Sequence, residues 1–285
     1  MKKKQAIRKM KADLKLRGLA PETQKMYKKN IKVFFAFAGV PIKKLNEDKA
    51  RNFLLHLVNE RKLAAKTVNT YSAAISFFFA VTLNRPMNYL QIPRMKTPSK
   101  LPVIASREEV AKMIDSCGNI KHKAMVLLAY GSGLRISEIS RLRSTDIKAD
   151  EMRVFVLGGK GKKDRYTLLP QQTLNTLRLY WKKYRPNNPE NWIFPSKSPE
   201  GHITTEGVSY AIESAALKSS IATHVTGHTL RHGFATHLLE DGVGLIKIKE
   251  LLGHSSIKTT TIYLHLANIT ENVISPADAL NQSER

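Results

Sequence analysis

Two arginines of this sequence occupy positions that a helix would turn toward a protein core. Arg135 follows a Gly-Ser-Gly-Leu turn and shares a helical stripe with Ile139 and Leu142. A guanidinium on an apolar stripe must reach solvent, pair with a carboxylate or hold an anion. Glu138, three residues further on, has the spacing of an ion-pair partner. An ion pair and an anion site are therefore both open for Arg135.

The second arginine, Arg231, follows His228 by three residues, so both side chains share one helix face. Leu230, Phe234 and Leu238 form the neighbouring apolar stripe. One arginine beside a core usually belongs to a structural ion pair. Two of them in one region, with a histidine alongside, indicate a site for a phosphate group.

A third group of residues lies nearer the C-terminus. Gly253 ends a predicted helix, His254 comes next, and Tyr263 follows on the succeeding element. A tyrosine in such a place is most often a core side chain. Five histidines of the region raise a metal site as an alternative: His228, His232, His237, His254 and His265. No HExxH motif, cysteine pair or carboxylate at ligand spacing accompanies them, so we expect no metal.

The chain that carries these residues is strongly basic. It has 285 residues with 47 Lys+Arg and 23 Asp+Glu, a formal net charge of +24. Residues 1–100 hold 23 of the basic and 5 of the acidic residues. Solubility does not require such a concentration of charge in one third of a chain. We therefore expect this part to bind a polyanion, with the phosphate backbone of nucleic acid as the partner.

Composition excludes several classes of protein. Hydrophobic residues make up 42% and charged residues 25%, as in globular proteins. No apolar stretch approaches the ~18 residues of a transmembrane helix, so we expect no membrane partner. The basic start is not followed by the apolar segment of a signal peptide. Cys117 is the single cysteine, so there is no disulfide framework. These features predict a cytoplasmic protein, associated with the nucleoid if its partner is DNA.

The first third of the sequence predicts a helical domain. Helices are expected at 21–38, 46–60 and 65–83, with Lys25, Lys28, Lys29 and Lys32 along a face of the first. Prolines then recur among basic residues, which is typical of an extended linker. We predict a helical DNA-binding domain over 1–92 and a basic linker over 93–103. The candidate DNA contacts are Lys25, Lys28, Lys29, Lys32, Arg94 and Lys96.

The remainder, 104–285, predicts a second domain of mixed structure. A capping box at Ser106 opens its first helix. Strands are expected at 152–157 and 165–169 around a lysine-rich turn, with a third short strand at 192–195. Helices are expected at 106–117, 120–130, 171–184, 205–219, 228–241, 245–252 and 256–265. The fold class is therefore mainly α with a small β-sheet.

Taken in order, these residues resemble the tyrosine site-specific recombinases, the family of the Xer recombinases and phage-type integrases. The matching set is Gly-Leu-Arg135, Lys160, His228-x-x-Arg231, Leu-Gly-His254 and Tyr263. The first domain and linker fit the family's SAM-like core-binding domain, so the resemblance covers about residues 12–270. Two departures stand out. Gly233 replaces a frequent serine, and Lys162 and Lys163 rival Lys160 at the hairpin tip.

The resemblance implies roles for the matched residues. Arg135 and Arg231 would clamp the scissile phosphate of DNA. Tyr263 would attack it, giving a 3′-phosphotyrosyl link and a free 5′-hydroxyl. His228 would take the proton of the tyrosine, and His254 would hydrogen-bond the phosphate. Each role is an expectation that the family's motif carries over to this chain.

The remaining implications concern Lys160, Glu138 and the assembly on DNA. Lys160 would protonate the leaving 5′-oxygen, and Glu138 would orient the arginine clamp. Strand exchange would pass through a Holliday junction in a homotetramer on double-stranded DNA, with no metal, ATP or other cofactor. A partner recombinase or accessory protein could take part. The tail from Ile269 onward would dock into a neighbouring subunit or fray at the terminus.

Two alternatives to a recombinase remain at this stage. One is a non-catalytic regulator that binds DNA and descends from a recombinase. The other is a type IB topoisomerase, which shares the chemistry but relaxes supercoils as a monomer. The sequence does not specify the target DNA site. It also does not distinguish chromosome-dimer resolution from integration or excision of a mobile element.

Overall fold

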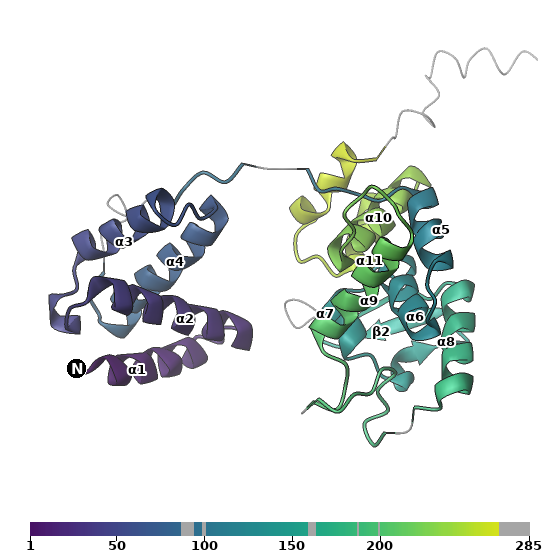
Figure 1. The fold of residues 1–285 in the computed structure, drawn as a ribbon, viewed down its shortest axis with the longest axis horizontal. Coiled ribbons are helices and arrows are strands. Elements are labelled where there is room, and N and C mark those ends of the chain that lie inside the picture. Colours follow the sequence, from purple (N-terminus) through teal and green to yellow (C-terminus); the bar gives the residue numbers. More distant parts are fainter. Residues whose placement is uncertain (87–93, 99–100, 159–163, 187, 199, 268–285) are drawn as a thin grey trace, which may run out of the picture. The chain divides into compact units, whose positions relative to one another are not determined.

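The chain folds into two compact units, Met1–Ser99 and Lys100–Arg285 (Figure 1). The computed structural model describes residues 1–86, 94–98, 101–158, 164–186, 188–198 and 200–267. The prediction of a mainly helical chain with a small sheet is confirmed. In the part of the chain that is described, no helix is both long and apolar enough to cross a membrane.

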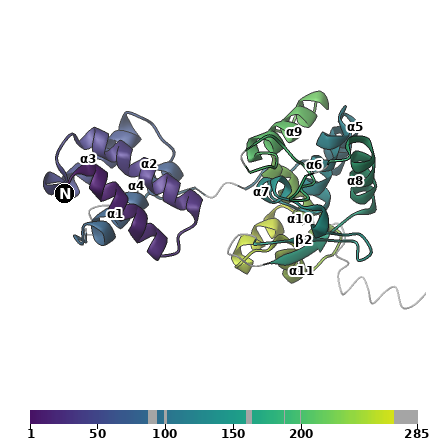
Figure 2. The same cartoon turned by 90° about the horizontal axis from the view of Figure 1, so that it is seen from below.

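All regular secondary structure described in the first unit is helical. Its elements are α1 (Lys3–Leu16), α2 (Pro21–Ala38), the 3₁₀ turn Ile42–Lys44, α3 (Glu47–Asn59), α4 (Ala65–Phe77) and the π-helical turn Phe78–Thr82. The helix α2 packs against α1 and α4 (Figure 2). Phe34, Phe53 and Phe78 fill the core between them. The three helices predicted from sequence are confirmed, and Asn46 caps α3 by accepting from the Lys49 N–H at 3.1 Å.

The helix α1 was missed by the sequence analysis. Its buried face consists of Ala6, Met10 and Leu14, spaced four residues apart and fully enclosed. Two of the three are small or flexible side chains set among lysines, so their periodicity is a weak signal.

Part of the predicted linker is held on the first unit. Residues 94–98 form no helix or strand, yet Met95 exchanges two backbone hydrogen bonds with the Asn69 side chain, each 2.9 Å long. Met95 also packs against the core of that unit. Arg94 and Lys96 on either side are exposed.

The second unit is built around one buried helix. Its helices are α5 (Arg107–Asp115), α6 (Ile120–Gly131), α7 (Ile136–Ser140), α8 (Gln171–Tyr184), α9 (Thr205–Lys218), α10 (Gly227–Glu240) and α11 (Leu245–Leu252). The side chains of residues 124–129 are all buried, and α6 contacts α8, α9 and α10 (Figure 1). α6 also contacts α7, so the central helix fixes the positions of α7 and α10, which carry candidate site residues.

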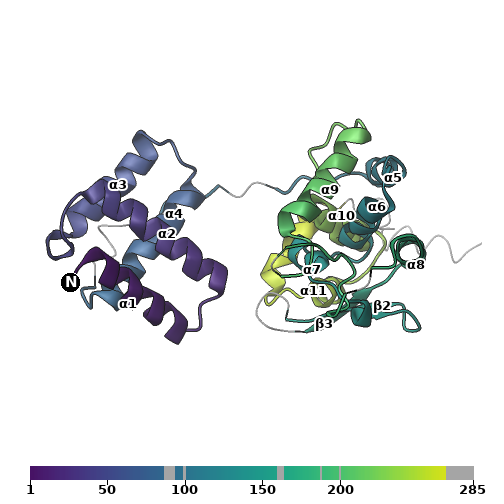
Figure 3. The same ribbon diagram turned by 60° about the horizontal axis from the view of Figure 1, so that its bottom comes forward.

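A three-stranded antiparallel sheet stands beside α11. Its strands are β1 (Ile147–Lys148), β2 (Arg153–Val156) and β3 (Arg165–Leu168), in the order β1-β2-β3. The register pairs Val156 with Arg165 and Arg153 with Leu168. β3 packs on α11 (Figure 3). The sheet therefore lies on the same side of the second unit as α11.

Three local predictions were wrong. Residues 192–195 make two single bridges, Arg143 with Trp192 and Pro195 with His202, in place of a strand. Residues 257–265 form two 3₁₀ turns, Ile257–Thr259 and Thr261–His265, in place of an α-helix. The helix α7 spans only Ile136–Ser140, so Arg135 is its N-cap residue and does not lie on a stripe with Leu142. Short segments such as these follow their tertiary contacts more than their own periodicity.

Gly233 offers a test of stability inside α10. A Cβ there would lie 3.6 Å from Tyr130 Cε2 and 3.7 Å from the Ala105 carbonyl oxygen, which are ordinary contacts. Because alanine is favoured over glycine inside a helix, we expect Gly233→Ala to raise the free energy of unfolding by about 0.5–1 kcal/mol. Urea unfolding measures this. Gly133→Ala is the contrast, since φ is +60° there and the Cβ would overlap the Phe234 ring. A loss of stability in Gly233→Ala would contradict the prediction.

Candidate active site

A buried carboxylate, Glu138, joins three arginines in the second unit. Its oxygens accept hydrogen bonds from Arg135 Nη1 at 2.7 Å and from Arg165 Nη1 and Nη2 at 2.9 and 2.7 Å. Arg231 Nη1 lies 3.8 Å from Glu138 Oε2. Burial opposes ionisation of Glu138, but the hydrogen bonds and charge of Arg165 outweigh it and lower the pKa to about 2. One carboxylate among three guanidiniums leaves an excess of positive charge, which favours an anion nearby.

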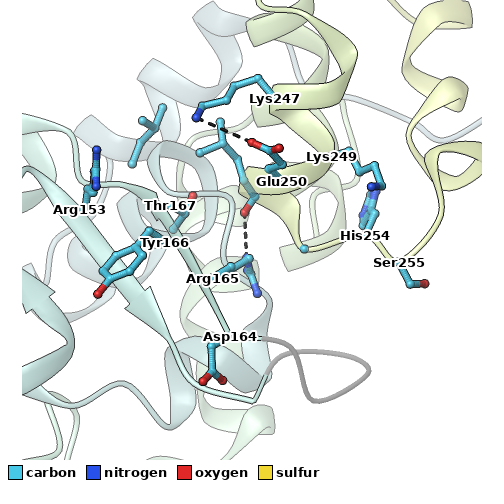
Figure 4. A pocket seen from close by; sticks show the side chains of 13 residues that line it. Arg153, Asp164, Arg165, Tyr166, Thr167, Lys247, Lys249, Glu250, His254 and Ser255 are labelled. Carbon is cyan, nitrogen blue, oxygen red and sulfur yellow. Dashed lines mark hydrogen bonds and ion pairs between the residues drawn. The ribbon is translucent and has the colours of Figure 1, made fainter.

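Arg165 was missed by the sequence analysis as a site residue. Its side chain is buried, and its Nε donates to the Leu251 carbonyl at 2.8 Å (Figure 4). Gly253, with φ +63°, leaves room for it, since a Cβ there would lie 2.8 Å from Arg165 Cδ. The signal was the period of the strand, which turns Arg165 and Thr167 inward and turns Tyr166 and Leu168 outward. Arg165 thus connects β3 to α7 and to the end of α11.

Arg231 is held from two sides by backbone carbonyls. Its Nη1 donates to the Gly133 carbonyl and its Nη2 to the Leu252 carbonyl. Burial, followed by the positive charge of Arg135, lowers the pKa of Arg231 to about 9. The group still carries its charge at neutral pH. An arginine has five N–H donors, so these two hydrogen bonds leave others for an anion.

Tyr263 lies in the 3₁₀ turn Thr261–His265 with only 1% of its surface exposed. Its hydroxyl is 3.0 Å from His232 Nδ1, and its ring stacks on that of His254 with centroids 6.5 Å apart. Burial raises the pKa of Tyr263, while the charges of Arg231 and Arg135 act in the opposite direction. The phenol is therefore neutral at rest, beside a pair of cations that would stabilise its ionised form.

Two imidazoles flank the tyrosine. His254 Nδ1 is 3.0 Å from the buried Thr260 hydroxyl, which fixes the orientation of the ring. Burial lowers the pKa of both His232 and His254 to about 4; the next contribution is the charge of His228 for His232 and of Arg231 for His254. Both rings are therefore neutral at physiological pH.

Most of the site residues predicted from sequence come together. Arg135, Glu138, Arg231, His254 and Tyr263 form one contiguous cluster. The ring of His228 lies 6.3 Å from that of His232, centroid to centroid. Lys160 and its rivals Lys162 and Lys163 fall outside the described residues, as does the tail from 268 to 285.

The residue that touches the Tyr263 hydroxyl, His232, was considered from sequence only as a metal ligand. The sequence did contain a signal for it, because His228 and His232 are four residues apart and so share a face of α10. Within the described residues, no three His, Cys, Asp or Glu side chains are placed to hold a metal ion.

A cavity of about 580 Å³ lies between β3 and α11, next to this cluster (Figure 4). Its lining includes His254 and six charged residues, the cations Arg153, Arg165, Lys247 and Lys249 and the acids Asp164 and Glu250. A cavity with this surplus of cations is suited to the phosphates of a polyanion.

A separate basic groove lies on the first unit. Its lining residues are Ile7, Arg8 and Lys11 of α1 and Lys25, Lys28, Lys29 and Lys32 of α2. Every charged residue that lines it is a cation. The four lysines predicted from sequence to contact DNA thus share one groove with two cations of α1 that the sequence analysis did not include.

Comparison with known protein families identifies the family of this chain. Residues 105–269 match the Phage integrase family, and residues 7–89 match the phage integrase N-terminal SAM-like domain. The chain belongs to the phage integrase family. It is a tyrosine recombinase, an enzyme class that breaks and rejoins DNA.

Relatives among tyrosine recombinases cover nearly the whole chain. A putative integrase/recombinase of Sinorhizobium fredii, y4qK, is 39% identical over 261 residues, covering 90% of this chain and 83% of its own. Tyrosine recombinase XerA of Thermococcus kodakarensis is 33% identical over 253 residues, covering 88% and 86%.

Solved recombinase structures share the fold. XerH bound to a palindromic difH substrate has a TM-score of 0.69 at 20% identity, covering 94% of this chain and 82% of its own. A lambda integrase dimer bound to a COC′ core site has a TM-score of 0.70 at 17% identity, covering 96% and 98%. At sequence identities of 20% and 17%, the structural similarity shows that this recombinase shares the fold of these proteins.

Proposed function

We propose that this recombinase cuts DNA through Tyr263 and exchanges strands at a specific site. The observation that carries the proposal is the burial of Tyr263 within reach of the charges of Arg231 and Arg135 in the same unit. In the reaction, a bond forms between Tyr263 Oη and the scissile phosphorus, and the bond to the 5′-oxygen breaks. The protein is left with a 3′-phosphotyrosyl link.

The arginine cluster supplies what phosphoryl transfer requires. Charge builds up on the non-bridging oxygens in the transition state, and fixed cations stabilise it without having to reorganise. Arg135 and Arg231 would grip these oxygens, because a guanidinium can donate two parallel hydrogen bonds and stays charged. Glu138 and Arg165 would hold the pair in place, while His254 would donate a hydrogen bond to the phosphate. Lys160 would give a proton to the departing 5′-oxygen.

Under this proposal the reaction requires neither ATP nor a metal. A phosphotyrosyl ester conserves the energy of the phosphodiester bond it replaces, so a 5′-hydroxyl can reverse the reaction. The arginines would provide the charge stabilisation that Mg²⁺ provides in other phosphoryl-transfer enzymes. Four such sites acting on two duplexes would make a homotetramer, with strands exchanged through a Holliday junction.

The basic groove of the first unit, with Arg94 and Lys96, would hold the DNA backbone. We expect Lys25→Gln, Lys29→Gln and Lys32→Gln together to reduce the slope of log affinity against log salt by about 2–3, because each lost phosphate contact removes about 0.9. Binding titrations at several salt concentrations measure this. The matched control is Lys43→Gln, Lys44→Gln and Lys49→Gln, which removes equal charge from exposed positions outside the groove. An equal effect in both triples would show that only net charge matters.

A covalent-capture experiment tests the proposed function. The protein is incubated with sheared, nicked DNA from its own genomic neighbourhood, with EDTA and without ATP, and is then denatured in SDS. DNA that stays attached is sequenced. Adducts at one discrete sequence support a site-specific recombinase and locate its site, which distinguishes chromosome-dimer resolution from mobile-element transfer.

Other results of that experiment would support different functions. Binding without adducts would favour a regulator that has lost catalysis. Relaxation of supercoiled plasmid by the protein alone, without a specific site, would favour a topoisomerase. Loss of adducts in EDTA would show that a metal is required.

A further inference from the structure

The surroundings of the Tyr263 hydroxyl limit where its proton can go. Only 1% of the Tyr263 surface is exposed, so bulk water has little access to this oxygen. The hydrogen bond described for it is the one with His232 Nδ1, at 3.0 Å, and the two rings lie 5.7 Å apart. A general base must stand within hydrogen-bond distance of the proton that it takes. His232 meets that condition in the resting chain.

We infer that His232 is the catalytic base that accepts the Tyr263 proton, an inference that rests on the proposed function. As the Tyr263 oxygen bonds to phosphorus, its proton moves to His232 Nδ1, and the departing 5′-oxygen takes a proton from a separate acid. In the reverse step His232 returns the proton to the phenol. His228, one helical turn earlier on α10, then acts as a neighbour of the base and not as the base itself.

The charges around His232 couple this proton transfer to DNA binding. His228 and Arg231 flank it on α10, and both act against its protonation. His254, after α11, and Tyr263, in the 3₁₀ turn, face it from the other elements. A phosphodiester bound by Arg231 would offset part of that positive charge. Since this raises the affinity of the imidazole for a proton, His232 becomes a better base when a scissile phosphate is in place.

The test separates proton transfer from positioning. His232→Asn keeps a hydrogen-bonding group near the place of Nδ1, but the asparagine amide cannot accept a proton between pH 5 and 9. His232→Ala removes both the hydrogen-bonding group and the proton acceptor. Single-turnover adduct formation is measured from pH 5 to 9 on the captured site. One set of substrates is normal, and another has sulfur in place of the scissile 5′-oxygen. A thiolate leaves without needing a proton, so the sulfur substrate reports activation of the nucleophile alone.

We expect both His232 variants to form adducts about 100- to 10,000-fold more slowly than the wild type, on the oxygen and the sulfur substrate alike. The deficit should shrink as pH rises, because hydroxide then replaces the missing base. Added imidazole should restore part of the rate to His232→Ala. Near-normal DNA binding and urea unfolding for His232→Asn would show that the fold is intact.

Three results would overturn the inference. A wild-type rate in His232→Asn would reduce the residue to a positioning group. If the sulfur substrate restored the rate of adduct formation in either variant, His232 would be assigned to protonation of the leaving group. The same rate loss and pH dependence in His228→Asn, with His232→Asn unaffected, would make His228 the base. If the wild-type protein itself forms no adduct on any DNA, that result contradicts the proposed function, on which the inference about His232 rests.

Discussion

Replacement of Tyr263 by phenylalanine will abolish the covalent adduct with DNA and leave DNA binding close to that of the wild type. The phenyl ring keeps its stacking on His254 and its place in the core with Phe234 and Leu252. What is lost is the nucleophilic oxygen and its hydrogen bond to His232, which costs about 1 kcal/mol of stability. SDS-resistant adducts and binding titrations on the captured site measure the two properties.

The control for this variant is Tyr184→Phe. Tyr184 is a half-exposed tyrosine at the end of α8 in the same unit, and it does not line the cavity between β3 and α11. We expect it to form adducts at the wild-type rate. An adduct that persists in Tyr263→Phe would mean that another side chain is the nucleophile, and the proposed mechanism would have to be abandoned.

Replacement of Arg231 by lysine will slow DNA cleavage about 100- to 1,000-fold while weakening DNA binding far less. This range is typical of losing one fixed donor to a developing oxyanion. Lysine can also carry a positive charge, but its single ammonium group cannot hold the Gly133 and Leu252 carbonyls and grip phosphate oxygens bidentately at once. Single-turnover adduct formation and binding affinity on the same site give the comparison.

The choice of lysine also limits damage to the fold. Arg231→Ala would leave the two carbonyls without a charged donor in a buried place, which costs several kcal/mol and obscures the kinetics. Arg178→Lys, at an exposed position of α8, is the matched control and should change nothing. If cleavage and binding fall equally in Arg231→Lys, Arg231 is a DNA contact and not part of the phosphate clamp.

Features set by local geometry could be predicted from the sequence. The start of α2 at Pro21, the Asn46 cap and the Ser106 capping box each depend on a few neighbouring residues, and each is confirmed. The pairing of Arg135 with Glu138 is local in the same sense, because three residues separate them at the start of one helix. The order of six residues also sufficed to indicate the family: Arg135, Lys160, His228, Arg231, His254 and Tyr263.

The contacts that complete the site were decided by tertiary structure. Arg165 reaches Glu138 across 27 residues of sequence, and a shift of one residue in the β2–β3 register would turn it to the other face of the sheet. His228 and His232 share a helix face, so their spacing alone could not tell which of them meets the Tyr263 hydroxyl. The packing of the 3₁₀ turn against α10 makes that choice. Periodicity states which side of an element a residue occupies, and only the packed chain determines which distant group it meets.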